Sequence, residues 1–247
     1  MGADAVNSQV VFDIKTPVNA EGIRSHVARS LAFGLPEADG LPLRTLTVVA
    51  NGPSARGRQF QGDTLALNGA YRLFAPESPP TYWVACDPQQ IVADFLGDVP
   101  FASTKHIVAS KCHPAVFDRL RDYDTSLWHI SDCDVGPLRA VPCAVSVTIC
   151  ALLLFQRLGY RRFEIYGWDC CYGPDGSHHA SEDGPIKADD IEVEINGGAK
   201  FKTTTTWAAE INDIMGVLPV LEWTGAEVNI HGEGMVAAIR RGLKSAA

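Results

Sequence analysis

The chain has 247 residues, 46% of them hydrophobic and 20% charged, which suits one large α/β domain with a sizeable core. Its 29 acidic and 21 basic residues give a formal net charge of −8. This balance argues against a protein that coats nucleic acid, because neutralising phosphates requires a basic face, whereas a small anionic ligand remains compatible. The sequence shows neither a signal-peptide pattern nor an apolar run long enough to span a membrane, so we expect a cytoplasmic protein.

Short β-branched or apolar runs alternate with helical segments along most of the chain. The predicted strands cover 45–50, 64–68, 81–87, 105–110, 126–130, 163–169 and 226–232. Helices are expected around Tyr71, through Ile91 and Phe95, over 114–121, 144–158 and 204–221, and at the C-terminus. Short apolar runs followed by helices are typical of buried parallel strands. The pattern predicts an α/β, Rossmann-like, doubly wound sheet that is mostly parallel and carries helices on both faces.

The first 40 residues precede this alternation and have a different pattern. Ile23, Val27 and Leu31 recur at helical spacing, which predicts an amphipathic helix. We therefore expect an N-terminal helical lead over 1–40, followed by a single nucleotide-binding domain over 41–247.

A long polar segment interrupts the alternation after the sixth strand. It is rich in Gly, Asp and His, and loops of this length in compact domains are usually functional or mobile. Within it, 191–195 and 199–203 flank Asn-Gly-Gly and predict a small β-hairpin. We expect 170–203 to form a lid over the site.

The seven cysteines are odd in number and scattered, and no two are spaced as CxxC. A disulfide framework or a cysteine zinc site needs paired or regularly spaced residues. Reduced, buried thiols are therefore expected.

Ligands of open parallel sheets bind at the carboxyl ends of the strands, near the point where the strand order reverses. The first predicted strand runs into Asn51, Gly52, Pro53 and Ser54, which match neither GxGxxG nor GxxxxGK. Such a turn at a helix start can still offer amides and a hydroxyl to a phosphate. The alternative interpretation is a plain strand–helix turn.

Asn68 and Asp87 follow the next two strands directly. Polar residues in this place more often cap the following helix than contact a ligand. Their position at one edge of the predicted sheet nevertheless makes both of them candidates for substrate binding.

The stretch YGWDCCYGPDGSHHASEDG (166–184) is the richest in reactive side chains. Trp168 and Asp169 end a predicted buried strand, where a carboxylate must be paired, hydrogen-bonded or used by a ligand. His178 and His179 follow, and histidine can act as a general base near neutral pH. Two adjacent histidines without a third ligand at fixed spacing are weak evidence for a metal, so no metal ligand is assigned.

The runs VVANGPSA, LALNGAYRLF, PPTYWVACDPQ and QRLGYRRFEIYGWDCCYGPDGSHHA resemble a known family. It is the 6-hydroxymethylpterin diphosphokinase-like family, which includes the domain of motility accessory factors that glycosylate flagellin. The runs also resemble the related bacterial sialyltransferases with a single Rossmann domain. The resemblance covers roughly residues 45–180, where five motifs follow one another in the same order.

The resemblance implies a role for each matching residue. Residues 51–54 would hold the phosphate and sugar of a cytidine nucleotide, and Asn68 would contact the donor. Asp169 and the loop after it would hold the ribose or the base. The pattern D-G-x-x-H-A of the flagellin-type members begins at Asp175 and places its histidine at His179, which favours this histidine over its neighbour.

The predicted function is a glycosyltransferase-like enzyme with a nucleotide-activated, CMP-linked sugar donor and His179 and Asp169 as catalytic candidates. The expected partner is a nucleotide or nucleotide-sugar, with no nucleic acid and no membrane span. The acceptor, a homo-oligomeric state and a requirement for Mg²⁺ stay open.

Two alternatives remain at this point. A pterin-type diphosphokinase would use ATP and Mg²⁺, but the aspartates that hold them in that family are reduced here to Asp87 after the third strand. A non-catalytic nucleotide- or sugar-binding protein is the other alternative. The sialyltransferases have a catalytic histidine in a lid beyond the late aspartate. After residue 180 this chain has only His231, in the last predicted strand, so His179 would have to replace that histidine.

Overall fold

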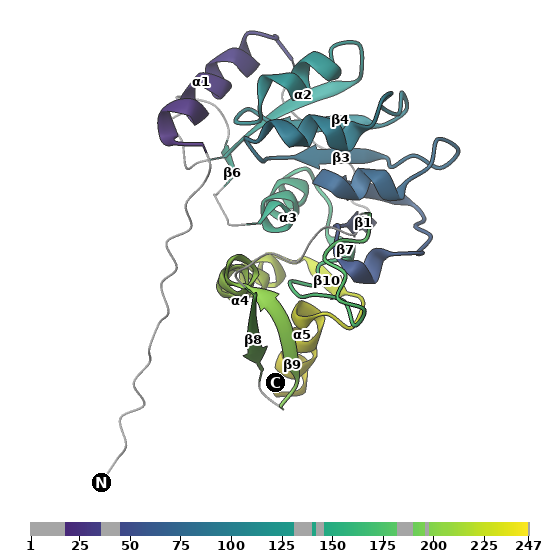
Figure 1. Ribbon diagram of the computed structural model, residues 1–247, viewed down its shortest axis with the longest axis vertical. Helices are drawn as coiled ribbons and strands as arrows, with labels where there is room; N and C mark the ends of the chain where they lie inside the picture. Colours follow the sequence, from purple (N-terminus) through teal and green to yellow (C-terminus); the bar gives the residue numbers. More distant parts are fainter. Residues whose placement is uncertain are drawn as a thin grey trace.

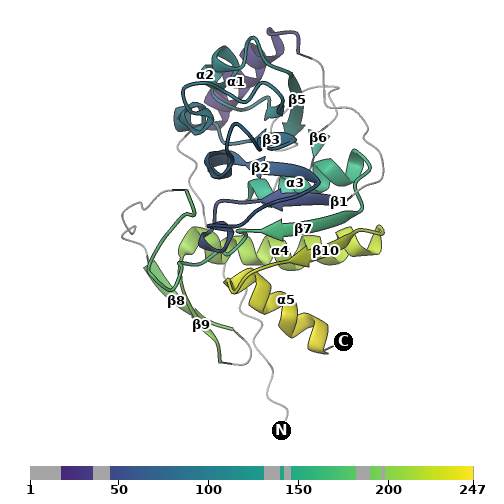
Figure 2. The same cartoon turned by 90° about the vertical axis from the view of Figure 1, so that its right-hand side faces the viewer.

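The computed structural model describes residues 18–35, 45–130, 140–141, 146–181, 190–195 and 198–246. In these ranges the chain forms an eight-stranded sheet in the order β10-β7-β1-β2-β3-β4-β5-β6, and every neighbouring pair is parallel. Figure 2 shows the strands stacked from β5 to β10, with α5 beyond the β10 edge. This confirms the predicted doubly wound α/β fold.

The elements have the following bounds. The sheet contains β1 (Thr45–Val49), β2 (Asp63–Leu67), β3 (Tyr82–Ala85), β4 (Lys105–Ala109), β5 (Thr125–Ile130), β6 (Ala140–Val141), β7 (Arg162–Tyr166) and β10 (Glu227–Ile230). The α-helices are α1 (Ala20–Leu31), α2 (Pro114–Arg119), α3 (Val147–Arg157), α4 (Thr205–Trp223) and α5 (Met235–Ala246). Three 3₁₀ segments complete this set, η1 (Pro53–Ala55), η2 (Asn68–Leu73) and η3 (Gln90–Leu96).

The strand order reverses between β1 and β7. From β1 the chain steps outward through β2 to β6, and it then returns through α3 to place β7 on the other side of β1. Val49 pairs with Tyr166, and the amide of Ala50 donates to the carbonyl of Tyr166 at 2.8 Å. The carboxyl ends of β1 and β7 therefore meet, which is where open α/β sheets bind their ligands.

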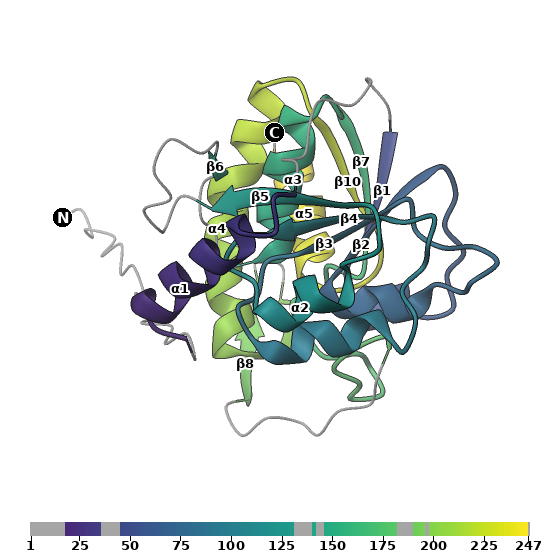
Figure 3. The ribbon, with the colours of Figure 1, turned by 90° about the horizontal axis from the view of Figure 1, so that it is seen from above.

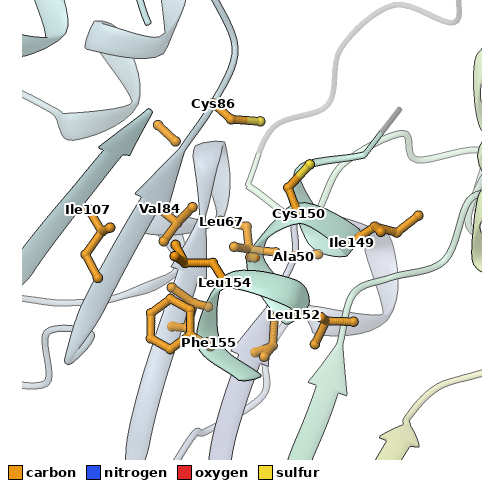
Figure 4. Close-up of a cluster of buried hydrophobic side chains, with 14 of the residues drawn as sticks. Ala50, Leu67, Val84, Cys86, Ile107, Ile149, Cys150, Leu152, Leu154 and Phe155 are labelled. Atoms are coloured by element: carbon orange, nitrogen blue, oxygen red, sulfur yellow. The ribbon is translucent and has the colours of Figure 1, made fainter. Parts of the chain in front are cut away.

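Helices cover both faces of the sheet. The segments η2, η3, α2 and α1 pack against one another, whereas α3 packs against α4. Figures 1 and 3 show α1 and α2 together and α3 on the other side of the strands. Ser146 caps the N-terminus of α3, because its hydroxyl accepts from the amide of Thr148 at 3.1 Å. The side chains of α3 face Leu67 and Val84 of the strands (Figure 4).

The predicted hairpin is present as β8 (Asp190–Glu194) and β9 (Lys200–Thr204), which pair antiparallel. It projects from the α4 side of the molecule in Figure 2. The Tyr172 amide donates to the Lys202 carbonyl at 2.9 Å, and the Thr203 hydroxyl donates to the Cys170 carbonyl at 2.6 Å. The hairpin is thus anchored to the segment that follows β7.

The N-terminal helix is also present, as α1, and it contacts the domain. The Ser30 hydroxyl donates to the carbonyl of Ser110 at 2.8 Å, and the rings of Phe33 and Phe117 lie 5.3 Å apart. A domain boundary near residue 40 stays a prediction, because 36–44 lie outside the described residues.

Several sequence predictions need correction. The helices expected around Tyr71 and through Ile91 and Phe95 are the short 3₁₀ segments η2 and η3. Gly97, with φ +66°, ends η3, and short connectors of this kind are commonly 3₁₀. The third strand ends at Ala85, so Asp87 lies beyond it. The strand expected over 163–169 ends at Tyr166.

Gly167 explains that early end of β7. Its φ of +71° is in the left-handed region, which turns the chain out of the strand and places Trp168 and Asp169 in the following loop. The two-residue strand β6 was missed, since two residues carry no periodic pattern.

Five cysteines lie within the described ranges, and all of them are buried and outside any disulfide: Cys86, Cys112, Cys150, Cys170 and Cys171. Burial raises the pKa of the Cys171 thiol to about 11, so this thiol stays protonated and unreactive at neutral pH. Cys133 and Cys143 lie outside the described residues. Among the helices that the structure describes, none is both long enough and apolar enough to cross a membrane.

Candidate functional site

Two adjoining cavities open at the carboxyl ends of β1 and β7, and together they are lined by all ten residues that the sequence singled out. The smaller, of about 520 Å³, is lined by Asn51, Gly52, Asn68, Asp87, Trp168, Asp169 and His179. The larger, of about 800 Å³, is lined by Pro53, Ser54, Asp169 and Asp175. The two cavities share Asp169 and Cys171.

The turn after β1 binds the loop after β7. The amide of Gly52 donates to the carbonyl of Gly167, and the amide of Ser54 donates to Oδ2 of Asp169, both at 2.8 Å. The sequence argument for a phosphate site relied on free amides in this turn. Two of those amides already have protein acceptors, so a phosphate bound to them would have to displace a carbonyl and a carboxylate.

Asp169 is buried at the junction of the two cavities, with 4% of its surface exposed. Burial raises the pKa of its carboxyl, and the hydrogen bonds from Ser54 partly oppose this rise. A Cβ added to Gly234 would lie 2.4 Å from Oδ1 of Asp169, so that glycine allows the close approach. Asp169 therefore joins β7, the first turn and the start of α5.

Asn51 fixes the loop that carries the two histidines. Its side-chain Oδ1 accepts from the amide of Ser181 at 3.2 Å, and its carbonyl accepts from the amide of Ala180 at 2.8 Å. The end of β1 thereby places His179 at the wall of the smaller cavity.

Asn68 holds an unusual backbone conformation and an unpaired side-chain oxygen. Its φ is +45°, a region that asparagine tolerates better than most residues, and its carbonyl accepts from Nε1 of Trp83 at 3.0 Å. Within the described part of the chain, its Oδ1 is buried and has no hydrogen-bond partner. A buried acceptor without a partner costs about 1–3 kcal/mol, and a ligand donor in the cavity would recover this.

The two histidines have different surroundings. His178 is buried, and its ring stacks on Trp207 with centroids 4.6 Å apart. His179 lines the smaller cavity with its ring edge-on to His178, and its carbonyl accepts from Nη2 of Arg56 at 2.9 Å. This geometry agrees with the preference for His179, whose catalytic role stays a prediction.

Two residues of α4 that the sequence analysis did not select also line the smaller cavity, Trp207 and Glu210. The Nε1 of Trp168 donates to Oε1 of Glu210 at 2.7 Å, and this carboxylate is only 7% exposed. Burial raises the pKa of Glu210, against hydrogen bonds from Ser146, Trp168 and Cys170. The signal available in the sequence was an acid in helical register with the apolar positions 214, 218 and 221.

Glu210→Gln is expected to become more stable relative to the wild type as the pH rises. A raised pKa means that the folded state binds a proton more tightly than the unfolded chain, so wild-type stability falls as pH increases through and above the ordinary glutamate pKa of 4.5. Glutamine removes that loss and keeps an oxygen for Trp168.

Urea unfolding at several pH values measures this effect, with Glu192→Gln as the control because the Glu192 side chain is 64% exposed. A stability difference between Glu210→Gln and wild type that does not change with pH would contradict the assignment of a strained, buried carboxylate.

The described acids of the smaller cavity accept hydrogen bonds from the protein itself. Asp87 accepts from the amide of Gln89 at 2.8 Å, Asp169 from Ser54 and Glu210 from Trp168. Across the ranges described, no three His, Cys, Asp or Glu side chains are grouped closely enough to hold a metal ion. Among the described residues, the carboxylates of this cavity are thus already hydrogen-bonded to protein donors.

Comparison with known proteins gives one structural likeness. No protein-family model matches the chain, and no curated protein matches it. The structure superimposes on that of the Maf glycosyltransferase from Magnetospirillum magneticum AMB-1 with a TM-score of 0.61 and 13% sequence identity. The match covers 89% of this chain and 39% of that one. The two proteins share a fold. This chain thus spans well under half of the length of the Maf glycosyltransferase, whose activity is not transferred by a likeness at this identity.

Proposed function

We propose that the protein is a glycosyltransferase-like enzyme that uses a nucleotide-activated sugar donor. The observation that carries this proposal is the buried, unpartnered Oδ1 of Asn68 in the smaller cavity at the reversal of strand order. Such an oxygen is suited to accept from a hydroxyl or amino group of a bound ligand. The fold shared with the Maf glycosyltransferase supports a site in the same kind of architecture.

The other side chains of the smaller cavity suit a nucleoside or sugar. Trp207 and Phe95 offer apolar ring surfaces for a base or a sugar ring, and Asn51 offers an amide. Among the described residues that line this cavity there is no Lys or Arg, whereas Asp87 and Glu210 add carboxylates. This lining favours uncharged, hydroxyl-rich groups. We propose a CMP-linked donor as the first candidate.

The proposed reaction uses His179 as the general base. The acceptor hydroxyl loses its proton to the His179 imidazole as its oxygen attacks the anomeric carbon of the donor. The bond from that carbon to the phosphate oxygen breaks, and the nucleotide leaves with the electron pair. Arg56 positions the base, because it holds the His179 carbonyl at 2.9 Å and the Asp175 carboxylate at 3.2 Å.

A thermal-shift screen against CMP, CDP, UDP, their sugar conjugates, and ATP with Mg²⁺ tests the proposal. Ligand at a hundred times its dissociation constant adds about 2.7 kcal/mol to the free energy of unfolding, which is readily detected. Stabilisation by a nucleotide or its sugar conjugate without metal is expected. Stabilisation by ATP only when Mg²⁺ is present would instead favour the diphosphokinase, and no stabilisation by any of these ligands would contradict the proposal.

Asn68→Gly is expected to weaken donor binding about tenfold, the effect of losing one hydrogen bond of about 1.4 kcal/mol. Glycine adopts positive φ readily, so the backbone is preserved while the oxygen is removed. Isothermal titration calorimetry with the ligand found in the screen measures the change. The matched variant Asn68→Asp keeps an oxygen at this position and should bind more tightly than Asn68→Gly, and equal affinities for the two variants would contradict the role of this oxygen.

A further inference from the structure

The larger cavity differs from the smaller one in its charge. Four cations line it, Arg56 and Arg58 after the first turn and Lys200 and Lys202 on β9. The hairpin and the first turn thus face the same cavity from segments far apart in the sequence. In a chain with a net charge of −8, four cations around a single cavity stand out from the overall acidic balance.

The acids that line the same cavity form ion pairs or hydrogen bonds with other groups of the protein. Asp175 pairs with Arg56 at 3.2 Å, and Glu233 pairs with Arg241 at 3.2 Å. The third acid, Asp169, is buried and accepts from the Ser54 amide, as described above. None of these carboxylates neutralises Arg58 or the two lysines of β9.

Arg58 is the least engaged of the four cations. In the described part of the chain, the one hydrogen bond of its side chain runs from Nε to the carbonyl of Ser54, at 3.4 Å, and the side chain forms no ion pair. Lys200 and Lys202 pair with Glu192 and Asp190 of β8, but more than half of each lysine side chain is exposed. The Glu192 side chain is also 64% exposed, whereas that of Asp190 is only 19% exposed. An ion pair that is exposed on both sides contributes little, so Lys200 can exchange its partner at low free-energy cost.

We propose that the larger cavity is the phosphate subsite of the donor nucleotide, held chiefly by Arg58 and Lys200. This subsite rests on the proposed function, and it lies in a different place from the phosphate site that the sequence predicted. The sequence placed the phosphate on the amides of residues 51–54, but the amides of Gly52 and Ser54 are bound to Gly167 and Asp169. The cations that begin two residues after Ser54 supply the positive charge instead.

The two cavities adjoin at Asp169 and Cys171, which suits a ligand that extends across both. The nucleoside or sugar would occupy the smaller cavity, and the charged phosphate would lie beside the first turn in the larger one. A guanidinium group is planar and can donate two parallel hydrogen bonds to phosphate oxygens, so Arg58 would orient the phosphate. The Lys200 ammonium would contribute mainly a positive charge.

The test compares nucleosides with nucleotides in calorimetric titrations of two double variants. Arg58→Gln with Lys200→Gln removes two cations of the larger cavity. The matched control, Lys105→Gln with Arg121→Gln, removes the same charge elsewhere. Lys105 is the first residue of β4 and so lies at the amino ends of the strands, away from the cavities, and the Arg121 side chain is 69% exposed. The probes are cytidine and CMP, uridine and UDP, and inorganic pyrophosphate.

We expect the wild type to bind each nucleotide at least tenfold more tightly than its nucleoside. The cavity variant should lose most of that difference and keep its nucleoside affinity, whereas the control should match the wild type. Nucleotide affinity that is unchanged in the cavity variant would overturn the phosphate subsite and leave the proposed function intact. Variant-sensitive binding of pyrophosphate without any nucleoside or nucleotide binding would keep the anion subsite but overturn the proposed function.

Discussion

Replacing His179 with alanine is expected to lower turnover of the donor by about 10²–10⁴-fold, the usual contribution of a positioned general base. The imidazole lines the smaller cavity, and its main chain is held by Arg56 and by the contact of Asn51 with Ala180. Those main-chain bonds remain in the variant, so donor affinity should change by less than about threefold. The measurement is nucleotide release from the sugar donor that gives the largest thermal shift, with water or a trial alcohol as the acceptor.

His231→Gln is the control for this prediction. His231 stacks on Tyr166 with ring centroids 4.3 Å apart, and its Nε2 lies 2.7 Å from Oε2 of Glu164. It lies at the end of β10 and lines neither cavity, so the variant should keep wild-type turnover. If His231→Gln loses turnover while His179→Ala keeps it, the assignment of His179 as the general base is wrong.

Replacing Gly52 with alanine is expected to destabilise the protein by about 1–3 kcal/mol or more, because the site has no room for a methyl group. An added Cβ would lie 2.4 Å from the carbonyl oxygen of Gly167 and 2.6 Å from Oδ2 of Asp169. Both neighbours are fixed, the first as backbone and the second by its bond to Ser54. The φ of Gly52 is −72°, which alanine adopts without strain, so the loss would be purely steric.

Chemical denaturation measures the loss, and Gly216→Ala supplies the comparison. Gly216 lies within α4, and beyond the nearby backbone of the helix itself no atom lies within 4 Å of an added Cβ. Alanine should therefore stabilise the helix by about 0.5–1 kcal/mol. Wild-type stability in Gly52→Ala would mean that the turn and the loop after β7 are not in contact. Gly52→Ala should also weaken donor binding, because the added methyl group forces the Asp169 side chain to move.

The sequence determined the layer structure of this protein. Buried strands such as TLTVV and YWVA are short, apolar and β-branched or aromatic, and the segments between them are long enough for crossovers, so parallel pairing followed directly. It also located the polar positions at the strand ends, and all ten selected residues line the two cavities. Local sequence patterns were less reliable for predicting where elements end and which segments are 3₁₀. Both depend on prolines and positive-φ residues, which act over only one or two positions.

Only the tertiary structure decided how these positions combine. The reversal of strand order places β7 beside β1, so Asp169 reaches the amide of Ser54 across 115 positions of sequence and occupies the donor that the sequence had assigned to a phosphate. The same packing brings Glu210 of α4 within hydrogen-bond distance of Trp168 and places Lys200 of β9 in the same cavity lining as Arg58. A local pattern specifies which groups can form hydrogen bonds, but their partners depend on long-range packing, which no single segment encodes.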